Sequence, residues 1–162
     1  MDKSGELKFL SLEIRESGGH AATRTLDTEA LASIGADAPF AGPVQVSLEF
    51  SVGEKELLLQ GTATGTVRDQ CARCLVPVTP GFAATLDQVY GNEISEIDVS
   101  GEIREAVMLA LPERALCRPD CKGLCPKCGQ NLNEKDCGHK PETPNAFAKL
   151  KGLIQPKQEK KS

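Results

Sequence analysis

The sequence predicts an α+β protein in which an antiparallel β-sheet is packed by a helix and is followed by a Cys-rich C-terminal segment. Three observations predict this. Apolar and polar residues alternate over residues 44–52, which is the pattern of a half-buried strand. Apolar residues recur at three- and four-residue spacing over residues 100–111, which is the pattern of an amphipathic helix. Five of the seven cysteines among 162 residues lie between Cys117 and Cys137, where Gly and Pro are frequent and no periodicity survives.

Three strands form the predicted sheet. The first covers residues 44–52, and its Val, Leu and Phe side chains occupy alternate positions. After a turn, residues 56–68 read as a second strand that ends near the first Cys pair, and residues 81–90 read as a third. We therefore expect an antiparallel β-meander that carries Cys71 and Cys74 at one end of a hairpin.

The strongest helical signal follows the sheet. We expect Ser100 to be the N-cap of a helix over residues 100–111, and Pro112 to end it. Its carboxylates Glu102 and Glu105 are expected to be solvated on the outer face, while its apolar stripe lies on the sheet.

The N-terminal part is weakly patterned. Residues 7–14 (LKFLSLEI) alternate well enough for a strand, and residues 27–34 suit a short helix. His20 is expected in a Gly-rich loop without a partner. Near the other end, residues 145–154 (NAFAKLKGLI) predict a last short helix.

These elements predict three parts of the chain. Residues 1–112 are expected to form the sheet and its helix, residues 113–144 a Cys-rich segment tied to the Cys71 and Cys74 hairpin, and residues 145–162 a short helix with a basic tail. The middle part has too few apolar residues to offset its folding entropy by burial. Something other than a hydrophobic core must order it.

Cysteine usage favours metal binding over disulfides as that ordering force. The first eighteen residues contain no apolar h-region and no small-residue cleavage site, so we expect a cytoplasmic protein, and disulfides are rare in the reducing cytosol. Seven thiols also cannot all be paired. Structural zinc is the cofactor that this composition predicts.

The spacing of the cysteines predicts one or two tetrahedral Zn²⁺ sites. A Cys-x-x-Cys turn can grip one ion with two thiolates, and a Gly after the second Cys permits the left-handed backbone that such turns use. Eight candidate ligands are available: Cys71, Cys74, Cys117 and Cys121 for one site, and Cys125, Cys128, Cys137 and His139 for the other. Alternatively, the two Cys-x-x-Cys pairs share one ion as in a zinc ribbon, and His139 is a surface residue.

Two reactive alternatives are less consistent with the sequence. Cys121, Cys125 and Cys128 match the spacing that holds a [4Fe–4S] cluster in radical enzymes, but only a short tail follows them. Cys71 and Cys74 could form a redox dithiol, but Pro77 and Pro80 prevent the helix that would depress a thiol pKa there. No catalytic motif and no membrane-spanning run are found, so we expect a protein that is not an enzyme, has no small-molecule substrate and contacts no membrane.

Charge is unevenly distributed along the chain. The net charge is −4, yet residues 138–162 carry six lysines and only two glutamates. A basic end can contact nucleic-acid phosphates even when the whole protein is acidic, although it also serves simply as a solvated tail. The candidate lysines for RNA or partner binding are Lys122, Lys127, Lys140, Lys149 and Lys151.

Several segments together resemble the YceD family of large ribosomal RNA subunit accumulation proteins. They are a CxRC pair after a hairpin, IDVSGEIREAVMLALPERALC, CKGLCPKCGQNLN and NAFAKLKGL, and they lie within residues 44–154. The resemblance implies a non-catalytic bacterial factor that supports 23S rRNA accumulation and large-subunit assembly. It also implies large-subunit rRNA or an early large-subunit ribosomal protein as the partner. The alternative is a zinc-stabilised module that acts on a ribosomal protein without touching RNA.

Overall fold

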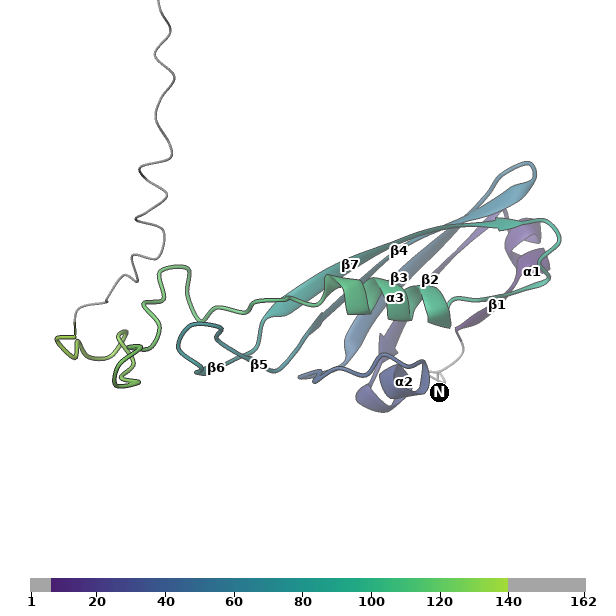
Figure 1. Ribbon diagram of the computed structural model, residues 1–162. Helices are drawn as coiled ribbons and strands as arrows, with labels where there is room; N and C mark the ends of the chain where they lie inside the picture. The colour runs from purple at the N-terminus through teal and green to yellow at the C-terminus, as the bar shows by residue number, and fades with distance from the viewer. Residues whose placement is uncertain (1–6, 140–162) are drawn as a thin grey trace, which may run out of the picture. The chain divides into compact units, whose positions relative to one another are not determined.

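The structure, a computed structural model, describes residues 7–139, which belong to two units that divide the chain into residues 1–121 and 122–162. Helices and strands are assigned in the first unit (Figure 1). In chain order they are β1 (Lys8–Leu10), α1 (Ser11–Glu16), β2 (Gly19–Leu26), α2 (Thr28–Ser33), β3 (Val44–Val52), β4 (Glu56–Thr66), β5 (Asp69–Gln70), β6 (Pro77–Val78), β7 (Gly81–Gly91), β8 (Glu96–Asp98) and α3 (Ser100–Ala110).

The main sheet has four antiparallel strands in the order β2-β3-β4-β7. Its register pairs Val46 with Ala63 across β3 and β4, and Ala63 with Ala84 across β4 and β7. The predicted meander of three strands is therefore confirmed as β3, β4 and β7. Two small antiparallel pairs, β1 with β8 and β5 with β6, complete the strands of the described residues.

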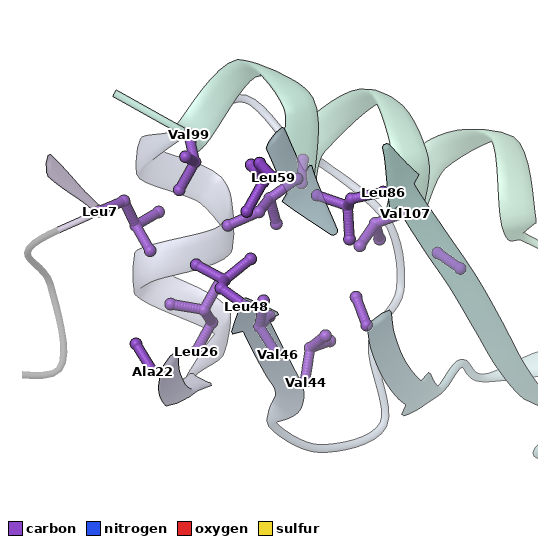
Figure 2. Packing of buried hydrophobic residues seen from close by; sticks show 14 of the residues in the cluster. Leu7, Ala22, Leu26, Val44, Val46, Leu48, Leu59, Leu86, Val99 and Val107 are labelled. Carbon is purple, nitrogen blue, oxygen red and sulfur yellow. The ribbon is translucent and has the colours of Figure 1, made fainter. Parts of the chain in front are cut away.

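One face of this sheet carries the core. Along β3, buried and exposed residues alternate from Val44 to Phe50, as the sequence pattern predicts. Helix α3 lies against this face and buries Ile103 and Val107 completely (Figure 1). Figure 2 shows Leu59 and Leu86 of the sheet packed together with Val107. The fold class predicted from the sequence, α+β with an antiparallel sheet packed by a helix, is confirmed.

The N-terminal segment is the first departure from the sequence prediction. Residues 7–14 do not form one strand, because only Lys8–Leu10 pairs with β8 and the chain then turns into α1. The turn is fixed by Ser11, whose N–H donates to the carbonyl of Ser95 at 3.0 Å and whose hydroxyl donates to that of Ile94 at 2.6 Å. Ser11 and Ile14 are both buried, and their three-residue spacing suits a helix.

Strand β2 is the second departure. Sequence analysis found no strand at residues 19–26 because its Ala and Thr side chains are short and give little hydrophobic contrast, yet β2 pairs with β3 over eight residues. His20 therefore lies in a strand and not in a loop. Its ring centroid is 5.6 Å from that of Phe9 and 6.5 Å from that of Phe50.

The ends of α3 differ in detail from the prediction. Ser100 is the first helical residue and not the N-cap; the N-cap is Val99, whose side chain makes no capping hydrogen bond. The Asp98 carboxylate accepts instead from the Ser100 N–H at 3.0 Å. Glu102 is not merely solvated, because the Tyr90 hydroxyl donates to it at 2.9 Å. None of the helices in the described part of the chain is long and apolar enough to cross a membrane.

Candidate metal centres

The first group of candidate ligands lies where two separate segments of the first unit meet. Cys71 and Cys74 belong to the turn between β5 and β6, a short hairpin at one end of the long strands β4 and β7 (Figure 1). Cys117 and Cys121 come from the loop that follows α3. Three of the four side chains are buried, and only Cys117 is exposed.

The geometry of this group suits a tetrahedral metal ion. Cys71 Sγ lies 3.8 Å from Cys121 Sγ, and Cys74 Sγ lies 3.6 Å from Cys117 Sγ. All four sulfurs lie within 4.8 Å of one another. Four sulfurs at the usual Zn–S distance in a tetrahedron are about 3.8 Å apart, whereas a disulfide requires about 2.05 Å. The group therefore fits an ion of the zinc type, and the cysteines are free thiols.

Backbone hydrogen bonds hold the two segments in place. The Ala72 N–H donates to the Ala115 carbonyl at 2.8 Å and the Cys71 N–H to the Val76 carbonyl at 2.9 Å. The Arg73 guanidinium donates through Nη1 to the Cys121 carbonyl at 2.9 Å. These contacts satisfy polar groups that the loops would otherwise leave unpaired, and they hold the turn of Cys71 and Cys74 against the loop of Cys117 and Cys121.

The thiols of this group influence one another's protonation. Burial by itself raises the pKa of Cys71, but backbone hydrogen bonds from Cys117, Arg73 and Cys74 outweigh burial and lower that pKa to about 6. Burial and the neighbouring sulfurs of Cys74 and Cys121 raise the pKa of Cys117 to about 12. One thiolate thus forms readily and opposes the formation of the next. A divalent cation at the centre would remove that conflict by stabilising all four thiolates.

The second group of candidate ligands lies wholly within the second unit. Cys125, Cys128, Cys137 and His139 have ligand atoms within 4.8 Å of one another, and Cys125 is the only buried member. Cys125 Sγ lies 3.9 Å from His139 Nδ1. Sulfur and imidazole nitrogen bound to one zinc ion are about 3.6 Å apart. The three thiols and the imidazole therefore also fit a tetrahedral ion.

This second group is built on a tight loop without regular secondary structure. An isolated β-bridge joins Leu124 to Asn131, and the Cys125 N–H donates to the Gln130 carbonyl at 2.9 Å. The Gly129 N–H donates to the Cys125 carbonyl at 2.8 Å, with Gly129 at a φ of 71°. Gly138, between the last two ligands, has a φ of 72°. Both glycines adopt the left-handed backbone that residues with a Cβ adopt at a cost.

Protonation in the second group follows the same logic. Backbone hydrogen bonds from Cys128 and Lys127 lower the pKa of Cys125 to about 6. A backbone hydrogen bond from His139 lowers the pKa of Cys137, but the Cys125 side chain and burial outweigh it and raise that pKa. As in the first group, one thiol loses its proton first, and a bound cation would favour deprotonation of the other thiols.

The structure brings together the two sets of four that the sequence analysis proposed. Cys71 and Cys74 belong to the first group, and Cys125 and Cys128 to the second. The zinc-ribbon and iron–sulfur alternatives combine residues of both units and stay predictions. Each set of four could hold a metal ion, and the identity of the ion remains a prediction.

The candidate RNA-binding lysines are only partly described. Lys122 and Lys127 are exposed in the second unit, each next to a candidate ligand in sequence. Lys140, Lys149 and Lys151 lie outside the described residues, as does the helix expected at residues 145–154.

Sequence analysis missed two features of the first group. It did not identify Ala72 and Ala115, whose backbone groups join the segments, because backbone pairing leaves no signature in an alanine. It also passed over Leu75, which directly follows a Cys-x-x-Cys pair where Gly is the expected residue. Comparing the two Cys-x-x-Cys pairs shows the difference, because Gly129 follows Cys128 whereas Leu75 follows Cys74.

An antiparallel sheet packed by a helix, together with two groups of residues that could each hold a metal ion, defines a small α+β protein with candidate metal centres. Within this class, residues 89–154 match the model of the YceD family, described as large ribosomal RNA subunit accumulation protein YceD. The YceD resemblance found in the sequence is thus confirmed for this segment, which contains α3 and six of the eight candidate ligands.

Relatives occur in bacteria and plants. An uncharacterised protein of Mycobacterium tuberculosis (strain H37Rv) is 34% identical over an aligned length of 118, and the alignment covers 62% of this chain and 56% of that protein. The chloroplastic large ribosomal RNA subunit accumulation protein YCED homolog 1 of Arabidopsis thaliana is 28% identical over an aligned length of 169, and the alignment covers 76% of this chain and 52% of the plant protein. The chain thus spans little more than half the length of these relatives. No solved structure matches it.

Proposed function

We propose that the protein is a non-catalytic, cytoplasmic factor of bacterial ribosome biogenesis that supports the accumulation and processing of 23S rRNA and the assembly of the large subunit. The observation that carries this proposal is the YceD match over residues 89–154. A plant relative named for large ribosomal RNA subunit accumulation supports it.

We further propose that each group of four ligands binds one structural Zn²⁺ ion. A zinc ion with four protein ligands has no open position for water or substrate, which is the arrangement of structural sites. In this proposal residues 1–112 form the sheet-and-helix scaffold, residues 113–144 the metal-ordered segment and residues 145–162 a basic extension. The zinc ions supply folding energy to loops that have little apolar surface to bury.

RNA contact in this proposal occurs through phosphates. The protein has no Trp, and its one Tyr is buried. It therefore offers RNA bases no exposed Trp or Tyr ring on which to stack. The lysines proposed for phosphate contact are Lys122, Lys127, Lys140, Lys149 and Lys151. The second candidate function, a module that acts on a large-subunit ribosomal protein without touching RNA, is favoured by the exposed leucines of the first unit, among them Leu109 at 87% exposure.

Depletion of the protein in its host tests the proposed function. We expect 23S rRNA and mature large subunits to fall relative to small subunits, and the protein to sediment with early particles and not with finished ribosomes. An unchanged ratio of large to small subunits after depletion would contradict the proposal.

The salt dependence of binding separates the two candidate functions. Phosphate contacts release counterions, so association with precursor particles should weaken steeply as salt is added. Replacing Lys122, Lys127 and Lys140 by Gln should flatten the slope of log affinity against log salt by up to about three units. If the triple variant keeps the wild-type affinity and slope, these lysines contact no phosphate and the protein-interaction function is favoured.

A further inference from the structure

The two Cys-x-x-Cys turns of this protein have the same backbone geometry. In the first, the N–H of the residue after the second Cys donates to the Cys71 carbonyl at 2.9 Å; in the second, the corresponding N–H donates to the Cys125 carbonyl at 2.8 Å. The residue that donates has a φ of 61° in the first turn and 71° in the second. Each turn therefore requires a left-handed residue at the same position.

The two turns differ in the residue that meets this requirement. The second turn uses Gly129, which adopts a left-handed backbone without strain, whereas the first uses Leu75. Leu75 is the single non-Gly residue with positive φ among the residues that the structure describes. A leucine adopts this backbone conformation at a cost. Leu75 is also 56% exposed, so it gains little from burial in the core. Gly would serve the turn better, which indicates that the leucine side chain has another use.

A second exposed leucine, Leu116, lies in the segment that is hydrogen-bonded to the turn of Leu75. The sulfurs of Cys74 and Cys117 are 3.6 Å apart, and Leu75 follows one of these cysteines while Leu116 precedes the other. Leu116 is 40% exposed. Its neighbour Ala115 is buried and accepts the hydrogen bond from Ala72, so the backbone at Leu116 is anchored to the first turn. Two exposed aliphatic side chains thus belong to two segments that these contacts join.

Arginines lie near both leucines in sequence. Residues 68–78 carry two arginines and one aspartate, and residues 113–120 carry two arginines, one glutamate and Asp120, which pairs with Arg118 at 3.7 Å. Arg73 and Arg114, the two nearest in sequence to the leucines, are exposed. Arg73 is also held in place by its hydrogen bond to the Cys121 carbonyl. Arginine is enriched at protein interfaces, where its guanidinium pairs with carboxylates.

The geometry points to a docking surface, formed by Leu75 and Leu116 with Arg73 and Arg114, for a segment of a partner protein that presents an apolar side chain beside an acidic one. This inference rests on the proposed function, because it places the partner protein in the large-subunit precursor. It adds to that function a contact in the first unit that is separate from the lysines proposed for RNA.

A protein segment fits this surface better than RNA does. Aliphatic side chains have no aromatic face on which a base can stack, whereas they gain free energy when a partner's apolar side chain removes both from water. The exposed guanidinium groups of Arg73 and Arg114 would complement a carboxylate on that partner.

The test measures binding of the full-length, zinc-loaded protein to purified large-subunit precursor particles. Leu75→Gly should relieve the backbone and Leu116→Ala leaves it unchanged, so both variants should keep the wild-type zinc content and melt within a few degrees of wild type. We expect each variant to bind the particles at least about tenfold more weakly. Leu12→Ala, which removes an exposed leucine (65%) from α1, is the matched control and should bind like wild type. A photo-crosslinking amino acid in place of Leu75 should attach to a protein of the particle.

The other outcomes overturn the inference in distinguishable ways. If the crosslink attaches to RNA, the surface contacts nucleic acid and not protein. If Leu75→Gly and Leu116→Ala bind like wild type, the leucines dock nothing; faster zinc release from Leu75→Gly would then show that Leu75 only shields the sulfurs. If wild-type protein does not bind the particles at all, the proposed function fails and this inference fails with it.

Discussion

The two groups of candidate ligands differ in how far apart in sequence their members lie. In the first group, Cys71 contacts Cys121 across 50 positions and Cys74 contacts Cys117 across 43. In the second, Cys125 and His139 are 14 positions apart. The first group therefore joins distant segments of a unit that has its own hydrophobic core, while the second closes a single loop.

They also differ in burial and in what surrounds them. Three of the four ligands are buried in the first group, against one of four in the second. The hydrophobic core cluster contains residues of the first unit only, among those described. We therefore expect a metal ion in the first group to reinforce a unit that has its own core, and we expect the described loop of the second group to depend on bonds to a metal ion.

Removing the second group should have the largest effect. In the double variant Cys125→Ser with Cys128→Ser, the zinc content should fall from two ions to one. The free energy of local unfolding of residues 122–139 should fall by more than about 3 kcal/mol, because ligand bonds supply most of the ordering there. Hydrogen exchange would show this at the Cys125 and Leu132 amides, which are bonded to Gln130 and Gly123.

The corresponding variant of the first group is the control. Cys71→Ser with Cys74→Ser removes the proposed metal link between segments about 50 residues apart. A disulfide stabilises a fold by about 2–4 kcal/mol, and we expect an effect of that order. We expect a lower melting temperature but a folded sheet, because β3, β4 and β7 carry their own apolar face. Global unfolding of the Cys125 and Cys128 variant, with the sheet amides unprotected, would show instead that the second group is integral to the core.

Metal exchange should separate the two groups kinetically. A chelator must reach the ion through its ligands, and three of the four ligands in the second group are not buried. We expect one zinc ion to leave at least about ten times faster than the other when a chromogenic chelator is added in excess. In Cys125→Ser with Cys128→Ser the fast phase should vanish. A single phase for both ions in wild-type protein would contradict the difference in burial.

The comparison also explains what could be predicted from sequence. The candidate ligands of both groups could be proposed from residue type and spacing, since thiols in a loop with little apolar content have few other uses. Strand β3 and helix α3 were identified because their apolar periodicity is strong. Spacing alone, however, left the pairing of Cys71 with Cys121 open, because it depends on a contact between the hairpin and the loop after α3.

The features that sequence reasoning missed depend on tertiary contacts. Strand β2 shows little alternation of apolar and polar side chains, and its hydrogen-bonded pairing with β3 defines it. The helical turn at Ser11 is fixed by carbonyls of residues 94 and 95, more than 80 positions away. Asp98 replaces Ser100 as the acceptor at the start of α3, although both residues are suitable capping types. Residue propensities alone could not predict this strand, this helical turn or this capping residue.

The turns of the two groups allow a finer test of backbone strain. Gly129→Ala should destabilise the second loop by about 1 kcal/mol, because nothing lies within 4 Å of the added Cβ and only the left-handed backbone is penalised. Leu75→Gly reverses that change in the first turn and should alter the stability of the first unit by no more than about 1 kcal/mol. Hydrogen exchange of the Gly129 amide and thermal melting measure the two effects. A large loss of stability in Leu75→Gly would mean that the leucine packs against the fold.

The smallest expected effect lies at the start of α3, the helix that leads into the first group. Hydrogen bonds from the hydroxyl and N–H of Ser100 hold the pKa of Asp98 below its usual value. Asp98→Ala should destabilise the first unit by about 1 kcal/mol, and Asp98→Asn, which keeps an acceptor oxygen but loses the charge at the helix start, by less. Because the pKa is lower in the folded state, this stabilisation is present above the unfolded pKa of about 3.9 and is lost as the pH falls through the folded value. The difference in unfolding free energy between wild type and Asp98→Asn should therefore be full at pH 6 and should shrink as the pH falls below about 3.9. A difference that does not shrink with falling pH would show that Asp98 acts through its shape and not its charge.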